Sequence, residues 1–100
     1  MKTYEVVFIL NERQVDDGGE SLTKDIVEHL TGLGGRVLKQ TNMGRRHFAR
    51  PIKKQKSGIY LDFIVELAPD KVKQVSQRYS LNPAVFRVGT LSYEGPPIEQ

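Results

Sequence analysis

The segment from Gly58 to Leu67 restricts the fold more than any other part of the sequence, because apolar and polar side chains alternate along it. Every second residue from Ile59 to Leu67 is apolar, whereas Asp62 and Glu66 occupy the opposite face. A repeat of two residues is typical of a β-strand that is buried on one face. The chain must therefore fold so that something covers one face of a sheet.

Three further segments have the composition of strands. Residues 3–10 are rich in β-branched and aromatic types, and their even-numbered members share one face. Residues 36–48 predict a long strand that Gly44 interrupts with a bulge or bend. Residues 85–93 predict a last strand, whose alternation assigns side chains to two faces: Phe86 and Val88 on one, and Val85, Arg87 and Leu91 on the other.

Two helices are predicted between these strands. Leu22, Ile26, Leu30 and Leu33 recur at helical spacing, with Ser21 or Asp17 available to cap the first turn. A second helix begins near Pro69 and Asp70, because proline and an acidic residue both favour a first turn. Its buried stripe is predicted to be Val72, Val75 and Tyr79.

Residues 53–57 predict a polar loop at the tip of the hairpin between the second and third strands.

The order of elements is β, α, β, β, α, β. This order predicts an α+β fold, the ferredoxin-like split βαβ plait, with a four-stranded antiparallel sheet and two helices on one face. The other face of such a sheet is open to a partner. The 100 residues are enough for one domain, which we place at residues 1–94, followed by a short flexible tail at 95–100.

The positive charge of the chain is concentrated in one segment. Residues 36–56 contain eight Lys or Arg and no Asp or Glu, whereas acidic residues outnumber basic ones on either side. Most runs of charge are simply solvated faces. Eight like charges without nearby carboxylates repel one another, however, and a polyanion would supply the missing counter-charge. The pattern therefore favours contact with a nucleic acid over a solvated face.

Several classes of function are excluded or disfavoured. The chain has no Cys and only two His, His29 and His47, so no metal site or cofactor is expected. Its longest apolar stretch is five residues, far short of a membrane span, and we expect a soluble protein of the cytoplasm without membrane contact. No catalytic motif occurs. A hydrolase resembling acylphosphatase would have only Asn11 and Arg13 for its phosphate loop.

Two motifs in the basic half of the chain carry a family likeness. Residues 43–54 read Met-Gly-Arg-Arg-His-Phe-Ala-Arg-Pro-Ile-Lys-Lys, and residues 58–60 read Gly-Ile-Tyr. With the opening Tyr4-Glu5, they resemble the bacterial small-subunit ribosomal protein S-six family, over essentially residues 2–93. The family has the split βαβ plait, so the resemblance and the order of elements imply the same fold.

The resemblance implies a structural, non-enzymatic role in the small ribosomal subunit. The chain would bind the central domain of 16S ribosomal RNA together with small-subunit ribosomal protein eighteen, assist assembly, and be a monomer when isolated. Candidate RNA-binding residues are Lys2, Arg45, Arg46, Arg50, Lys53, Lys54, Lys56 and Arg87. Candidate partner-binding residues are Phe48, Ile52, Tyr60 and Phe86, for which ordinary core packing is the alternative. Lys2 is expected to lie beside Arg87.

One position departs from the family pattern. Arg50 stands where the family usually has Tyr between Ala and Pro. An aromatic residue there could stack on a base or pack on a partner, whereas Arg can stack and also bind phosphate in a bidentate manner.

The alternative function is a homo-oligomeric module of the same fold that senses an anion or another small ligand through its open sheet face.

Overall fold

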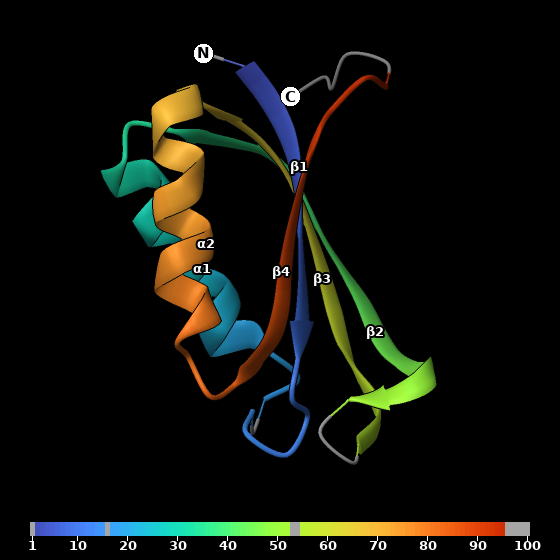
Figure 1. Ribbon diagram of the computed structural model, residues 1–100. Helices are drawn as coiled ribbons and strands as arrows, with labels where there is room; N and C mark the ends of the chain where they lie inside the picture. Colours follow the sequence, from blue (N-terminus) through green and yellow to red (C-terminus); the bar gives the residue numbers. More distant parts are fainter. Residues whose placement is uncertain (1, 16, 53–54, 96–100) are drawn as a thin grey trace.

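A four-stranded antiparallel sheet forms one layer of the molecule, and two helices form the other (Figure 1). The computed structural model describes residues 2–15, 17–52 and 55–95. In chain order the elements are β1 (Lys2–Leu10), α1 (Glu20–Gly32), β2 (Arg36–Ile52), β3 (Gln55–Leu67), α2 (Val72–Ser80, preceded by the 3₁₀ turn Pro69–Lys71) and β4 (Val85–Ser92). The predicted split βαβ plait is confirmed.

The strands lie in the order β2-β3-β1-β4, so β1 and β3 are central and β2 and β4 form the two edges. Both helices pack against the same face of this sheet, as Figure 1 shows. The opposite face carries no helix. The sheet therefore presents one broad open face, as the order of elements predicts.

The core lies between the helices and the covered face of the sheet. Phe8 of β1 is fully buried, and its ring meets Phe63 of β3 and Tyr79 of α2 edge to face, at 5.5 and 5.3 Å between centroids. Ile26 and Leu30 of α1 complete this layer and are also fully buried. The predicted alternation in β3 is confirmed, because every odd position from Ile59 to Leu67 belongs to the core.

Of the two predicted caps of the first helix, Asp17 contacts its first turn, whereas Ser21 lies inside α1. The Asp17 carboxylate accepts the backbone N–H of Ser21 at 3.0 Å, and Gly19 occupies the residue before α1. This interaction satisfies one of the otherwise unpaired amides of the first turn. Pro69 opens the 3₁₀ turn that leads into α2, and Val75 and Tyr79 of α2 are buried.

The hairpin of β2 and β3 extends further than the sequence predicts. Gly44 has a φ of +76° at a shift in pairing register, which confirms the predicted bulge. The strand does not end at Phe48, however: it continues through Pro51 to Ile52, which pairs with Gln55. The loop predicted at 53–57 is wrong for its described residues, 55–57, which belong to β3. Pro51 lacks a backbone N–H and fits into β2 because, in an edge strand, one side of the backbone makes no pairing hydrogen bonds.

The predicted division of side chains in β4 is also wrong. Leu10 pairs with Val85 and Ile9 pairs with Arg87, so β4 contains one extra residue at this bulge. Val85 and Val88 therefore both pack toward the core, and Phe86 does not share a face with Val88. The bulge frees Phe86 to pack on the aromatic residues of the open face.

Candidate nucleic-acid interface

Three aromatic rings from three strands form a cluster over the open face of the sheet. Phe48 of β2 lies 6.2 Å from Tyr60 of β3 and 6.1 Å from Phe86 of β4, measured between ring centroids. All three side chains are half-buried and none belongs to the main core. Phe48 and Phe86 pack on each other outside the main core and remain partly accessible.

Gly58 makes the position of the Phe48 ring possible. A Cβ atom at Gly58 would lie 2.6 Å from the carbonyl oxygen of Leu10 and 2.8 Å from Cζ of Phe48. An isolated glycine within a strand often marks such a close approach. The Phe48 ring can therefore occupy this position only because residue 58 is glycine, which has no side chain.

A groove of about 490 Å³ runs beside this cluster. Phe48, Tyr60 and Ile9 provide its apolar surface, and Arg50 and Arg87 add two exposed guanidinium groups. His47, Ala49 and Pro51 complete the lining. Arg50 and Arg87 are 37 positions apart in the sequence, but the curved end of β2 brings them to one groove. A cationic groove with aromatic walls suits a polyanion that also offers flat apolar groups.

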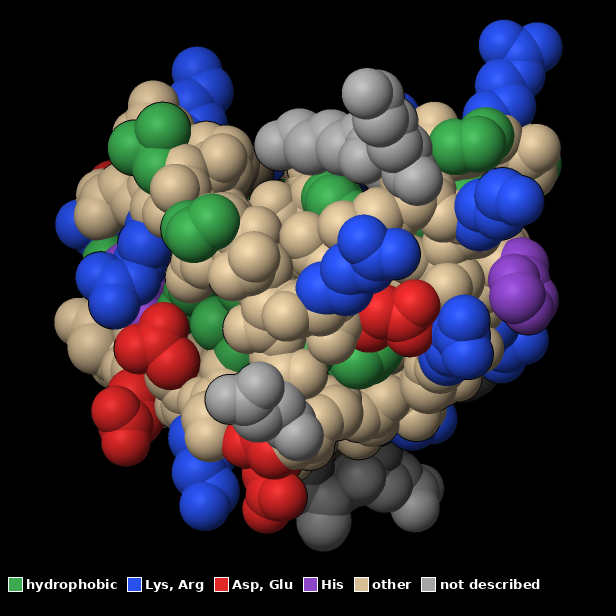
Figure 2. All heavy atoms as spheres, turned by 90° about the horizontal axis from the view of Figure 1, so that it is seen from below, with side chains coloured by type: hydrophobic (Ala, Val, Ile, Leu, Met, Phe, Trp, Pro, Cys, Tyr) green, Lys and Arg blue, Asp and Glu red, His purple; other side chains and the backbone are tan. Residues whose placement is uncertain are grey.

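The remaining basic residues lie along the same hairpin. Arg46 and Lys56 are exposed, and Arg46 lies opposite Gly58 in the ladder of β2 and β3. Figure 2 views the molecule from the end that carries this hairpin, and Lys and Arg side chains dominate the hairpin side. The acidic side chains in that view gather mainly toward the helices. The uneven charge of the sequence is therefore also uneven in space.

Arg45 differs from its neighbours because it already has an anionic partner. Its Nε lies 3.1 Å from the Glu12 carboxylate and donates to Ser57 Oγ, also at 3.1 Å. Ser57 is almost fully buried and donates its hydroxyl to Glu12 at 2.7 Å. Sequence reasoning missed this network, because Glu12 follows β1 and is far from Arg45 along the chain.

The structure corrects the placement of Lys2. Lys2 pairs with Leu67 at one end of β1, whereas Arg87 pairs with Ile9 near the other end. Seven residues of extended chain span about 23 Å, so Lys2 does not lie beside Arg87 or its groove. Of the other candidates, the side chain of Ile52 and the residues Lys53 and Lys54 lie outside the part of the chain that the structure describes.

A pair of acidic residues lies elsewhere on the open face. Asp62 of β3 is placed opposite Val7 of β1, and Glu5 lies next to it on the same side. Burial, the hydrogen bond with Glu5 and the charge of Glu5 raise the pKa of Asp62 to about 6, and nearby Lys39 opposes the shift. One oxygen of Asp62 is buried without a hydrogen bond among the described residues. The open face is therefore basic at the hairpin and acidic near its centre.

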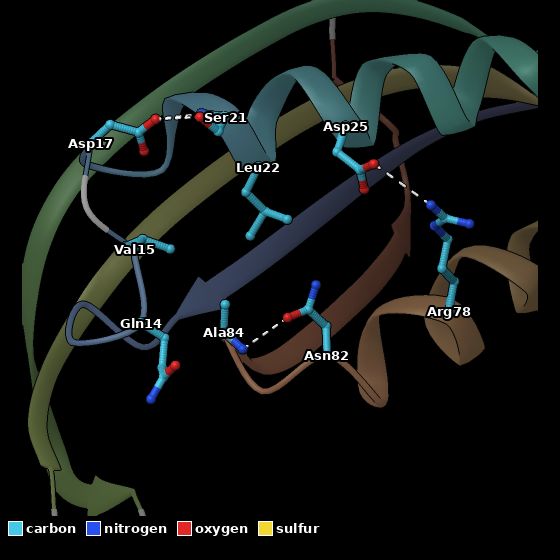
Figure 3. A pocket seen from close by; sticks show the side chains of 9 residues that line it. All are labelled: Gln14, Val15, Asp17, Ser21, Leu22, Asp25, Arg78, Asn82 and Ala84. Atoms are coloured by element: carbon cyan, nitrogen blue, oxygen red, sulfur yellow. Dashed lines mark hydrogen bonds and ion pairs between the residues drawn. The ribbon is translucent and has the colours of Figure 1, made fainter.

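A second hollow lies on the helix side of the molecule. Figure 3 shows the residues that line it, which come from the loop between β1 and α1, from α1, and from the end of α2 with the turn that follows it. Its charged groups already bind one another: Arg78 lies 3.6 Å from Asp25, and Asp17 accepts from Ser21. Asp25 also accepts the Tyr79 hydroxyl at 2.8 Å, and burial together with this bond raises the pKa of Tyr79. The contacts of Asp25 with Arg78 and Tyr79 hold α1 to α2.

His29 and Asn11 each contact a neighbouring group. His29 packs its ring edge on Tyr79, and burial and the charge of Arg78 lower the pKa of His29. No group of three or more potential metal ligands occurs in residues 2–15, 17–52 and 55–95. No helix in that part of the chain is long and apolar enough to cross a membrane. The side-chain oxygen of Asn11 accepts the backbone N–H of Arg13 at 3.0 Å and thereby stabilises the turn after β1.

Comparisons with known proteins identify the family of the chain. Residues 3–92 match the family model described as Ribosomal protein S6. Small ribosomal subunit protein bS6 of Fusobacterium nucleatum is 31% identical over 87 residues, which cover 87% of this chain and 93% of the relative. The bS6 protein of Thermus thermophilus is 32% identical over 97 residues, covering 96% and 95% of the two chains.

Solved structures give the same result. The 30S ribosomal protein S6 of Thermotoga maritima matches with a TM-score of 0.79 and 26% identity, over 92% of this chain and 87% of that one. The C-terminal domain of the MgtC protein from Mycobacterium tuberculosis matches with a TM-score of 0.67 but only 17% identity, over 99% and 95% of the chains, and shows the fold alone. The chain therefore belongs to the ribosomal protein S6 family, whose members are structural constituents of the small ribosomal subunit and not enzymes.

Proposed function

We propose that this chain binds the central domain of 16S ribosomal RNA as a heterodimer with small-subunit ribosomal protein eighteen, and so assists assembly of the subunit. One observation carries the proposal: Arg50 and Arg87 line the same groove as Phe48 and Tyr60, on the sheet face that neither helix covers. Cationic and aromatic groups that converge on an open face form a surface for both a polyanion and a protein partner.

The aromatic cluster is the surface that would bury against the protein partner. Phe48, Tyr60 and Phe86 are half-buried in the isolated chain, so each still has apolar area to lose to a partner. Aromatic residues near the centre of an interface usually contribute most of the binding free energy. Ile52 lies at the end of β2, adjacent to this cluster in sequence, and belongs to the same proposed surface.

The exposed cations would neutralise phosphates around that surface. Arg46, Lys56, Arg50 and Arg87 are all exposed and lie on the hairpin or beside the groove. Lys53 and Lys54 are included in the proposal from the sequence. Phosphate contacts fix position without reading bases, so specificity would come from the shape of the RNA and from the heterodimer as a whole.

The test is a salt titration of the reconstituted heterodimer with a transcript of the 16S central domain from the same organism. If about four phosphates are contacted, the logarithm of the association constant should fall with log salt at a slope of about −3 to −4. A complex without a salt slope would contradict the proposal.

Size-exclusion chromatography of the isolated chain should give a monomer. A stable homodimer that is unaffected by protein eighteen would favour the alternative, a homo-oligomeric sensing module.

The protein interface has its own variant. Phe48→Ala should weaken association with protein eighteen by about fivefold or more, because truncation of an aromatic residue that anchors an interface costs over about 1 kcal/mol. Leu81→Ala is the matched control, since Leu81 is 86% exposed and follows α2 on the helix side. Calorimetry of both variants should show a loss for Phe48→Ala alone. Equal affinities for the two variants would place the partner elsewhere.

A further inference from the structure

A third, smaller hollow of about 280 Å³ lies where the loop after β1 meets the hairpin of β2 and β3. Three cations from three separate segments line it: Arg13 from the loop, Arg45 from β2 and Lys56 from β3. Glu12, Gln55 and Ser57 complete its lining. Arg13 lies outside the basic segment of the sequence, so only the fold brings it to the other two cations.

The local structure holds these groups in place. The side-chain oxygen of Asn11 accepts the backbone N–H of Arg13, which fixes the turn that carries Arg13 and Glu12. Ser57 Oγ bonds both Glu12 and Arg45, and Ser57 itself is only 4% exposed. The backbone of the hollow is therefore set by the first turn after a central strand and by the pairing of two other strands, and Glu12, Arg45 and Ser57 are held by their own contacts.

The charges in the hollow do not balance. Three cations face one carboxylate, so a positive charge remains after Glu12 has paired with Arg45. Within the described part of the chain, Glu12 and Ser57 contact Arg45 at Nε. The two terminal nitrogens of its guanidinium group remain for a second anion, and their planar geometry matches the oxygens of a phosphate.

We propose that this hollow binds one phosphodiester group of the RNA, with Arg13 and the two terminal nitrogens of Arg45 as its phosphate contacts. The inference rests on the proposed function, because it takes its ligand from the same RNA. Glu12 keeps its contact with Nε of Arg45 when the phosphate binds. Its negative charge lies beside the phosphate and lowers the affinity of the hollow for any polyanion.

Three variants test the inference in the heterodimer with the 16S central-domain transcript. Arg13→Gln should weaken binding about fivefold at 0.1 M salt and make the salt slope shallower by about 0.7 to 0.9, the amount for one phosphate. Glu12→Gln should strengthen binding about twofold to fivefold, because it removes a negative charge beside the bound phosphate. Lys73→Gln, an equal loss of charge on the exposed side of α2, should leave affinity and slope unchanged.

The outcomes separate this inference from the proposed function. Gln at position 12 can still accept the Ser57 hydroxyl, and Arg13 is exposed, so both variants should melt like the wild type. Arg46→Gln serves as the reference, because Arg46 lies outside this hollow. If Arg46→Gln weakens binding but Arg13→Gln and Glu12→Gln match the wild type, the phosphate site is wrong and the RNA-binding function stands. If the heterodimer has no salt-dependent affinity for the transcript, both fail.

Discussion

The rings of Phe48 on β2 and Phe86 on β4 meet edge to face, with centroids 6.1 Å apart and planes at 74°, although β2 and β4 are the two edges of the sheet. Neighbouring strands are about 4.8 Å apart, so the edges of a flat four-stranded sheet lie about 14 Å apart. The contact exists because the end of β2 shifts register between His47 and Ile52 and because β4 bulges at Phe86. The candidate groove is a consequence of these two irregularities.

Replacing the glycine beneath this contact should be costly. Gly58→Ala places a Cβ against the backbone of β1 at 2.6 Å and against the Phe48 ring at 2.8 Å, and the backbone cannot move aside. We expect a loss of about 1 to 3 kcal/mol in the free energy of unfolding, the range for overpacking a well-packed site. Urea denaturation of the purified variant measures this loss.

Gly89→Ala is the control for that experiment. Gly89 lies on β4, where an added Cβ would meet no atom within 4 Å and φ is not positive. Its stability should stay within about 0.5 kcal/mol of the wild type. If both alanine variants were equally stable, the close approach of Phe48 and β1 to Gly58 would be refuted.

Asp62 should make stability depend on pH. Its pKa in the folded protein is about 6, above the ordinary 3.8, so the folded state binds more protons than the unfolded state between these values. The free energy of unfolding should therefore be highest below about pH 4 and fall as the pH rises to 6. Asp62→Asn should remove this fall and stabilise the protein at pH 7.5 by about 1 kcal/mol, discounted for solvent screening.

Thermal melts of wild type and Asp62→Asn between pH 4 and 8 measure this effect. Glu5→Gln removes the neighbouring charge that helps to raise the pKa of Asp62, so it should weaken the same dependence in part. A wild-type protein whose stability rises steadily from pH 4 to 6 would show that the two carboxyl groups do not interact as described.

The hydroxyl of Tyr79 should contribute to the packing of α2 on α1. Tyr79→Phe removes the bond to Asp25 without opening a cavity, and we expect a loss of about 1 kcal/mol. Tyr4→Phe is the control, because no hydrogen bond of the Tyr4 hydroxyl is found within the described residues. Equal stability of the two variants in urea would mean that the bond to Asp25 contributes nothing.

Much of the fold could be predicted because its signals are local. The alternation in β3, the spacing of Ile26 and Leu30, and the proline before α2 each depend on a few neighbouring residues. These patterns were enough to give the order of elements and therefore the plait. The bulge at Gly44 was predictable for the same reason, since an isolated glycine interrupts a strand pattern.

The errors arose where pairing between strands overrides the local pattern. The alternation of β4 assigned Phe86 to the face of Val88, but the extra residue opposite Ile9 and Leu10 reverses that assignment. A bulge of this kind depends on the partner strand and leaves no mark in β4 itself. Likewise, the separation of Lys2 from Arg87 follows from the pairing register of β1 with its neighbours. Arg13 and Arg45 line the same hollow only because the fold brings their segments together. Burial of the aromatic cluster could not be foreseen without those contacts.

We propose that the open sheet face around the groove, and not the helix face, meets the rest of the ribosome. The direct measurement is site-specific photo-crosslinking in cells, with benzoylphenylalanine in place of Arg50, of Arg87 or of the exposed Lys24 on α1. Small subunits isolated by sedimentation should carry crosslinks to 16S RNA or protein eighteen from positions 50 and 87, and none from position 24. Crosslinks from position 24 without any from the groove would contradict the account.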